Sequence, residues 1–115
     1  MVIDIFTLGF TFILIHEMDA MRCHEWRILP ITSFMNEKLG MTTFIFLHIP
    51  LFYVFLFPIL FTSESFRFGC SIFFIVHLFL HLLFLTHKKN EFKDWISWSL
   101  ISGAGICGLL YIMMD

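Results

Sequence analysis

Four long runs of mostly apolar residues alternate with short polar segments along the chain. The runs extend over about residues 2–20, 41–61, 66–85 and 92–113. A helix needs ~20 apolar residues to cross the hydrocarbon core of a bilayer, and each run is about that long. A lipid-exposed segment must pair its own backbone polar groups, which favours helices over open strands. The pattern predicts an all-α, polytopic membrane protein in which residues 1–115 form a single domain.

Short connections between the runs make neighbouring helices antiparallel, so we expect a bundle of four transmembrane helices. The first helix can continue as far as Leu29, because Pro30 disfavours a helical residue before it. Apolar residues at positions 31, 34, 35 and 39 have helical spacing. They predict a short interfacial helix between the first two spans, and Gly40 is expected to end it.

Basic residues predict how the bundle lies in the membrane. Six of the seven Lys and Arg residues lie near the first and third connections, and Arg67 lies on the other side. By the positive-inside rule, loops 21–40 and 86–92 are expected in the cytoplasm. Both termini are then expected on the outer side of a bacterial inner membrane.

Composition agrees with this class and excludes several others. Apolar types make up 59% of the 115 residues and charged types 14%, and 17 residues are Phe. So little polar surface rules out a small soluble domain, and so much apolar surface rules out disorder. The net charge of −2 offers no basic surface for nucleic acid. The lipid bilayer is therefore the expected partner.

Histidine is the most informative residue type, because ionisable groups inside a membrane are costly and face the bundle interior. His16, His48, His77 and His81 come from three predicted helices and lie at overlapping depth in the cytoplasmic half. His77 and His81 are four residues apart, so they share a helix face and can ligate one ion. We expect a divalent metal site, with zinc, iron or manganese as the candidate ions.

Acidic and basic residues near the first histidine extend this hypothesis. Glu17 or Asp19 is expected to ligate the metal or to act as a general base. Arg22 and Arg27 are candidates to hold an anionic head group, and Arg22 is also three residues from Glu25, a spacing that allows an ion pair. Together these residues suggest a metal-dependent enzyme that acts on a lipid-like substrate, although no motif identifies a reaction.

Two alternatives use the same histidines differently. In the first, His and Asp form a structural hydrogen-bond network in a non-enzymatic subunit or packing module. In the second, His48 with His77 or His81 ligates haem between facing helices. A zincin site is excluded, because the H-E-x-x-H motif that would start at His16 has Ala20 as its last residue.

Small residues recur every four positions on the last predicted helix, at Ser99, Gly103 and Cys107. Such a pattern lets helices approach closely, either within the chain or in a homo- or hetero-oligomer. Cys70 and Cys107 lie at similar depth, so a disulfide between them is geometrically allowed.

The whole pattern resembles an uncharacterised family of small bacterial four-helix membrane proteins, a domain of unknown function. The first segment carries the most specific part of the resemblance, with the arrangement H-E-x-D-A-x-R-x-x-E-W-R from His16 to Arg27. Further matching residues are Pro30, His48, Pro50, Phe66, Arg67, Gly69, His77, His81, Glu91, Phe92, Ser97 and Trp98. The resemblance implies a four-helix membrane topology and a bacterial source. It implies no activity, cofactor or substrate.

Overall fold

The computed structural model describes residues 2–59 and 63–114, and within these residues every regular element is helical. The elements are α1 (Val2–Arg22), the 3-10 helix η1 (Glu25–Arg27), α2 (Glu37–Ile59), α3 (Glu64–Phe84) and α4 (Trp95–Met114). The predicted all-α class with four long helices is therefore confirmed. Two of the helices, α3 and α4, are long and apolar enough to cross a membrane.

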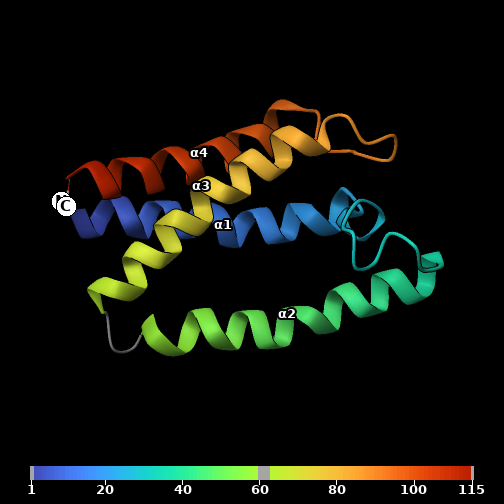
Figure 1. Cartoon of the computed structure of the whole chain (residues 1–115), viewed down its shortest axis with the longest axis horizontal. Helices are drawn as coiled ribbons and strands as arrows, with labels where there is room; N and C mark the ends of the chain where they lie inside the picture. Colours follow the sequence, from blue (N-terminus) through green and yellow to red (C-terminus); the bar gives the residue numbers. More distant parts are fainter. Residues whose placement is uncertain (1, 60–62, 115) are drawn as a thin grey trace.

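Helices α1, α3 and α4 pack together, and α4 makes the most extensive contacts with the other two. Helix α2 lies apart from this group and contacts mainly η1 (Figure 1). The start of α1 and the end of α4 lie at one end of the molecule (Figure 1). The connections that follow α1 and α3 lie at the opposite end. The described helices therefore form a three-helix group with α2 beside it.

Buried apolar side chains form two clusters along the three-helix group. The first lies toward the start of α1 and consists of Phe6, Phe10, Ile13, Cys70, Phe74, Ala104 and Tyr111. The second lies toward the end of α1 and consists of Ala20, Cys23, Trp26, Ile28, Phe44, Phe92 and Ile101. Along α1, the position between the two clusters is occupied by His16, which is completely buried.

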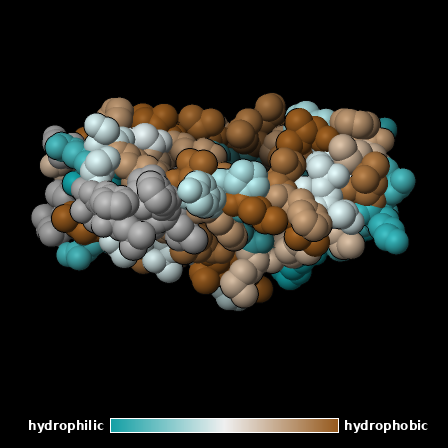
Figure 2. Space-filling view, turned by 90° about the horizontal axis from the view of Figure 1, so that it is seen from below, coloured by the Kyte–Doolittle hydropathy of each residue, from teal (hydrophilic) through white to brown (hydrophobic). Residues whose placement is uncertain are grey.

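Large apolar side chains also remain on the outside of the helices. Phe79, Leu83 and Leu109 are each about half exposed or more, at 62%, 65% and 49%. Figure 2 shows hydrophobic residues over much of one face, with hydrophilic residues mainly toward its ends. A water-soluble protein of this size rarely exposes so much contiguous apolar surface.

Glycines on α4 allow the close packing of this helix within the chain. A Cβ atom at Gly103 would lie 2.9 Å from the ring of Phe12 on α1. A Cβ atom at Gly108 would lie 2.7 Å from the carbonyl oxygen of Ser71 on α3. The small-residue side of α4 thus packs against α1 and α3. Ser99 is an exception, because it is exposed and its hydroxyl group donates to the carbonyl oxygen of Trp95 in the same helix.

The predicted interfacial helix over residues 31–39 is wrong, and so is the continuation of the first helix to Leu29. Helix α1 ends at Arg22, because His24 adopts a left-handed conformation with φ 52° and turns the chain. Residues 28–35 form turns and bends, and α2 begins at Glu37, so Gly40 lies inside a helix. Asn36 explains this start, because its side-chain oxygen accepts the N–H of Leu39 at 2.9 Å.

Capping side chains also set the starts of the last two helices. Ser63 accepts the N–H of Phe66 at 3.0 Å, and Asp94 accepts the N–H of Ser97 at 3.0 Å. Helix α4 therefore begins three residues later than the predicted residue 92. Residues 60 and 61 of the second predicted span, like residues 1 and 115, lie outside the described residues.

We predict opposite effects on stability for two glycine substitutions. Gly108→Ala should destabilise the fold by about 1–3 kcal/mol, because the new Cβ meets the backbone of Ser71. Gly69→Ala is the matched control on α3, where a Cβ meets nothing within 4 Å. It should stabilise the helix by about 0.5–1 kcal/mol. Unfolding of the purified variants, followed by circular dichroism, measures both; an equal effect of the two substitutions would contradict this packing of α4.

Candidate functional site

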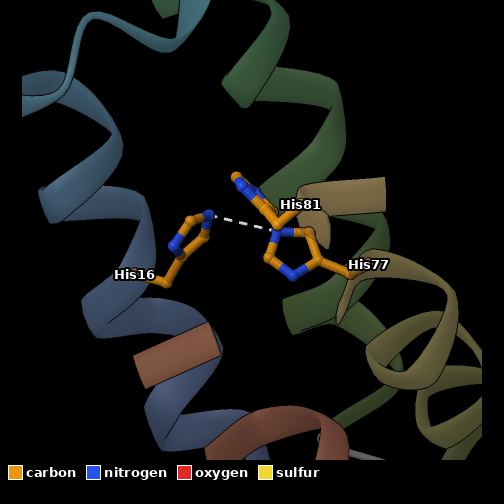
Figure 3. Close-up of side chains that lie close together, drawn as sticks. All are labelled: His16, His77 and His81. Carbon is orange, nitrogen blue, oxygen red and sulfur yellow. Dashed lines mark hydrogen bonds between the residues drawn. The ribbon is translucent and has the colours of Figure 1, made fainter. Parts of the chain in front are cut away.

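Three histidines meet in the interior of the molecule, where α1 faces α3 (Figure 3). The Nε2 atoms of His16 and His77 are 3.1 Å apart. The centroid of the His81 ring is 4.9 Å from that of His16 and 4.5 Å from that of His77. One nitrogen from each ring can be chosen so that all three lie within 4.8 Å of one another. We call these three residues the histidine cluster.

The helices bury all three side chains of the cluster. His77 and His81 are one helical turn apart on the inner face of α3, and His16 projects from α1 between the two apolar clusters. The exposed fractions of His16, His77 and His81 are 0%, 8% and 1%. Phe92 covers the cluster, with its ring centroid 5.4 Å from that of His16 and 4.6 Å from that of His81.

Most nitrogens of the cluster lack a hydrogen-bond partner within the described chain. These atoms are Nδ1 of His16, Nδ1 of His77 and both ring nitrogens of His81. Buried polar groups in folded proteins are nearly always paired, because an unpaired one costs about 1–3 kcal/mol. A purely structural hydrogen-bond network would be expected to satisfy these nitrogens. The arrangement therefore indicates a site where the histidines bind a further ligand, such as a metal ion.

A buried carboxyl group completes the surroundings of the cluster. Glu25 belongs to η1, and its Oε2 lies 3.7 Å from Nε2 of His16. Its Oε1 lies 3.9 Å from Nε2 of His81, and the residue is 8% exposed. Burial raises the pKa of Glu25 to about 8, with a smaller contribution from the negative charge of Glu17. A nearby cation would favour the ionised form of this carboxyl group.

Sequence spacing had suggested that Glu25 pairs with Arg22, and the structure places the two side chains differently. The left-handed conformation of His24 redirects the chain after α1 and turns Glu25 toward the histidines. Nothing in the spacing of residues 22–27 indicates such a turn, because left-handed conformations are uncommon for residues other than glycine. Glu25 is thus the member of the site that sequence reasoning missed.

His48, an expected ligand, lies in a different place. Its Nε2 is 2.5 Å from Oε2 of Glu17, and its Nδ1 is 2.6 Å from the carbonyl oxygen of Phe44. Both ring nitrogens are therefore engaged between α1 and α2, and His48 is not a member of the histidine cluster. The structure does not bring His48 together with His77 or His81 as haem ligation would need.

Asp19, the other expected acid, joins α1 to α4. Its Oδ2 accepts the hydroxyl hydrogen of Ser97 at 2.5 Å, and its Oδ1 accepts Nε–H of Arg22 at 2.7 Å. Asp19 is 7% exposed and Ser97 is completely buried. Arg22 also binds Asp94 at 3.1 Å. These bonds give Asp19 and Arg22 a role in holding two helices together.

Arg27 makes a second set of ion pairs, at the molecule's loop end. It binds Glu37 at 2.8 Å and Glu91 at 3.2 Å, and Nδ1 of His24 is 2.8 Å from the same Glu91 carboxyl group. The segment after α1 is thereby tied to the start of α2 and to the loop before α4. Cys70 and Cys107 are buried free thiols, so the structure contains no disulfide between them.

The spacing of the site atoms suits a metal ion with four ligands. Zinc lies about 2.0–2.2 Å from nitrogen and oxygen ligands, so two ligands of a tetrahedral ion are about 3.4 Å apart. Three separations among the site atoms, 3.1, 3.7 and 3.9 Å, lie on either side of this value, and the three histidine nitrogens lie within 4.8 Å of one another. Three imidazoles and one carboxylate are a donor set that suits zinc, iron or manganese.

Comparison with known proteins identifies the family of the chain and little else. Residues 3–115 match the model of a family described as "Family of unknown function (DUF6713)". The match covers nearly the whole sequence, so the chain belongs to this family, as the resemblance of its motifs had suggested. No curated protein and no solved structure matches the chain. The case for a function therefore depends on the geometry of the site.

We predict that Asp19 contributes more to stability than the ion pairs at the loop end. Asp19→Ala should destabilise the protein by about 1–3 kcal/mol, because it leaves the buried hydroxyl of Ser97 without its acceptor. Glu37→Ala, the control, removes an exposed partner of Arg27 and should change stability less. Thermal unfolding of both variants decides the matter, and a larger loss in Glu37→Ala would show that the α1–α4 bonds are weak.

Proposed function

We propose that this member of the family is an integral membrane protein that binds one divalent transition-metal ion through His16, His77, His81 and Glu25. The observation that carries the proposal is the meeting of three buried imidazoles whose nitrogens lie within 4.8 Å of one another. A metal ion would give Nε2 of His81, which is buried without a hydrogen-bond partner, a ligand role beside Nε2 of His16 and His77. It would also balance the charge of the Glu25 carboxylate.

The sequence and the exposed surface support the membrane location. Helices α3 and α4 have the length and apolar composition of membrane spans. Large apolar residues such as Phe79 and Leu83 are exposed on α3, where lipid would surround them. In the proposed topology α1 and α2 also cross the bilayer, and their polar side chains face the protein interior or each other.

Basic residues support an orientation with the loop end in the cytoplasm. Arg22, Arg27, Lys38, Lys88, Lys89 and Lys93 belong to the segments at that end. Both termini would then lie on the outer side. Since Glu25 lies just beyond α1, the metal would sit in the cytoplasmic half of the membrane, within reach of an ion that enters from that side.

The donor set favours binding of the ion over activation of water. Four protein ligands fill a tetrahedral shell, as in structural zinc sites, whereas catalytic zinc keeps one position for water. Nε2 of His81 and Oε1 of Glu25 are 3.9 Å apart, more than the ~3.4 Å between two ligands of a tetrahedral zinc ion, so a fifth ligand could enter at this edge. A metal-dependent reaction would need that edge to open to a substrate.

Metal analysis of the purified protein tests the proposal. The protein is purified in detergent and loaded with Zn²⁺, Fe²⁺ or Mn²⁺ in separate samples. Each sample is freed of excess ion by gel filtration and analysed by mass spectrometry for metal per chain. We expect about one ion per chain in the wild type, and loss of the ion in the double variant His77→Ala/His81→Ala. Glu25→Gln keeps the size of the side chain and should weaken binding by at least about tenfold.

His87→Gln is the matched control, because His87 lies in the connection after α3 and outside the cluster. This variant should retain the ion. Circular dichroism confirms that each variant is folded. A folded wild-type protein that retains no zinc, iron or manganese after loading would overturn the proposal and make the histidines structural. Equal loss of metal in the control and the cluster variants would do the same.

A further inference from the structure

Outside the metal cluster, Glu17 and His48 form a second polar site, between α1 and α2. Nε2 of His48 and Oε2 of Glu17 are 2.5 Å apart, and the two side chains are 18% and 15% exposed. Glu17 follows His16 directly in α1, so the two residues leave the helix in different directions. His16 faces α3, whereas Glu17 faces α2. We call this pair the Glu17–His48 dyad.

The hydrogen bonds of His48 fix the net charge of the dyad. A carbonyl oxygen can only accept, so the contact with Phe44 requires a hydrogen on Nδ1 of His48. A single further proton is then shared between Nε2 of His48 and Oε2 of Glu17. Whether that proton resides on the imidazole or on the carboxyl group, the dyad carries no net charge. Oε1 of Glu17 takes no part in this bond.

The dyad lies in an apolar groove between the two helices. The groove has a volume of about 360 Å³, which lies in the range of small-molecule sites. Apart from the dyad, its walls consist of Leu14, Met18, Met21, Phe44, Ile45 and Phe52. Helix α2 lies apart from α3 and α4 (Figure 1), so the groove is a feature of the α1–α2 pair. The methionine side chains are unbranched and adapt to ligands of different shape.

We propose that this groove binds an amphiphile that has a hydrocarbon chain and an uncharged hydroxyl head group, such as a long-chain alcohol. The apolar walls match the chain, and the hydroxyl group would donate a hydrogen bond to Oε1 of Glu17. A charged head group is disfavoured, because the neutral dyad offers no opposite charge to pair with it and the apolar walls cannot solvate it. His48 acts as a positioning residue that holds the Glu17 carboxyl group in the groove.

The proposal does not depend on the metal site, although the two sites are neighbours. His16 and Glu17 are consecutive residues, but His16 faces α3 and Glu17 faces α2. The residues of the groove come from α1 and α2, whereas two of the three clustered histidines come from α3. Variants of the groove can therefore be tested for metal content and ligand binding in the same preparation.

Photolabelling in phosphatidylcholine nanodiscs tests this site. The probe is hexadecanol with a photoreactive diazirine in its chain, and labelled peptides are mapped by mass spectrometry. We expect saturable labelling of residues 14–21 and 44–52 that unlabelled hexadecanol displaces. Palmitic acid, which has the same chain length and a charged head group, should compete at least about tenfold less well.

Three variants separate head-group recognition from a general effect on the fold. Glu17→Leu removes the acceptor and should weaken labelling at least about tenfold. Glu17→Gln retains an amide oxygen as acceptor and can donate to Nε2 of His48, so labelling should largely survive. Leu8→Met, an exposed position of α1 outside the groove, is the control and should label like the wild type. All variants are expected to retain metal, which separates failure here from failure of the metal site.

A second blocking variant keeps the test decisive if Glu17→Leu does not fold. Ile45→Trp fills the groove while both residues of the dyad are retained, and it should abolish saturable labelling, whereas Leu83→Trp on the outer face of α3 should not. Labelling that does not saturate, or that spreads evenly over α3 and α4, would show surrounding lipid only and overturn the proposal. Equal competition by palmitic acid would also overturn it.

Discussion

A buried imidazole nitrogen must find a partner or destabilise the fold, and the contact between α1 and α3 concentrates several such nitrogens in one small space. His16, His77 and His81 leave four ring nitrogens unpaired within the described chain. The two apolar clusters on either side exclude water from this position. An ion between α1 and α3, with Glu25 as the fourth ligand, would bind one nitrogen of each ring.

Other polar residues of α1 contact other helices, so three sides of α1 each carry a polar contact. Asp19 binds Ser97 of α4, and Glu17 binds His48 of α2. The histidine at position 16 faces α3. One apolar helix thus uses three nearly consecutive polar residues to contact three different helices. Such residues are costly in an apolar setting, which explains why each is paired or clustered.

Periodicity predicted the four long helices and the shared face of His77 and His81, because these features depend on local spacing alone. It also indicated His16 as a candidate ligand, because His16 has a predicted depth in the membrane that overlaps with those of His77 and His81. It could not separate His48 from the cluster, because depth along an axis does not say which way a helix faces. Glu25 was missed as a ligand for a different reason, since its position depends on the left-handed turn at His24. The start of α2 was also missed, because it depends on the side chain of Asn36, which accepts the N–H of Leu39.

X-ray absorption spectroscopy of the zinc-loaded protein tests the central claim most directly, because it reports the ligands and not only the amount of metal. The account predicts a shell of four nitrogen or oxygen ligands at about 2.0–2.1 Å, with the multiple-scattering pattern of three imidazoles. A zinc–sulfur distance of about 2.3 Å would place the ion at a cysteine such as Cys23 and contradict the account. A shell of oxygen ligands without imidazole would contradict it equally.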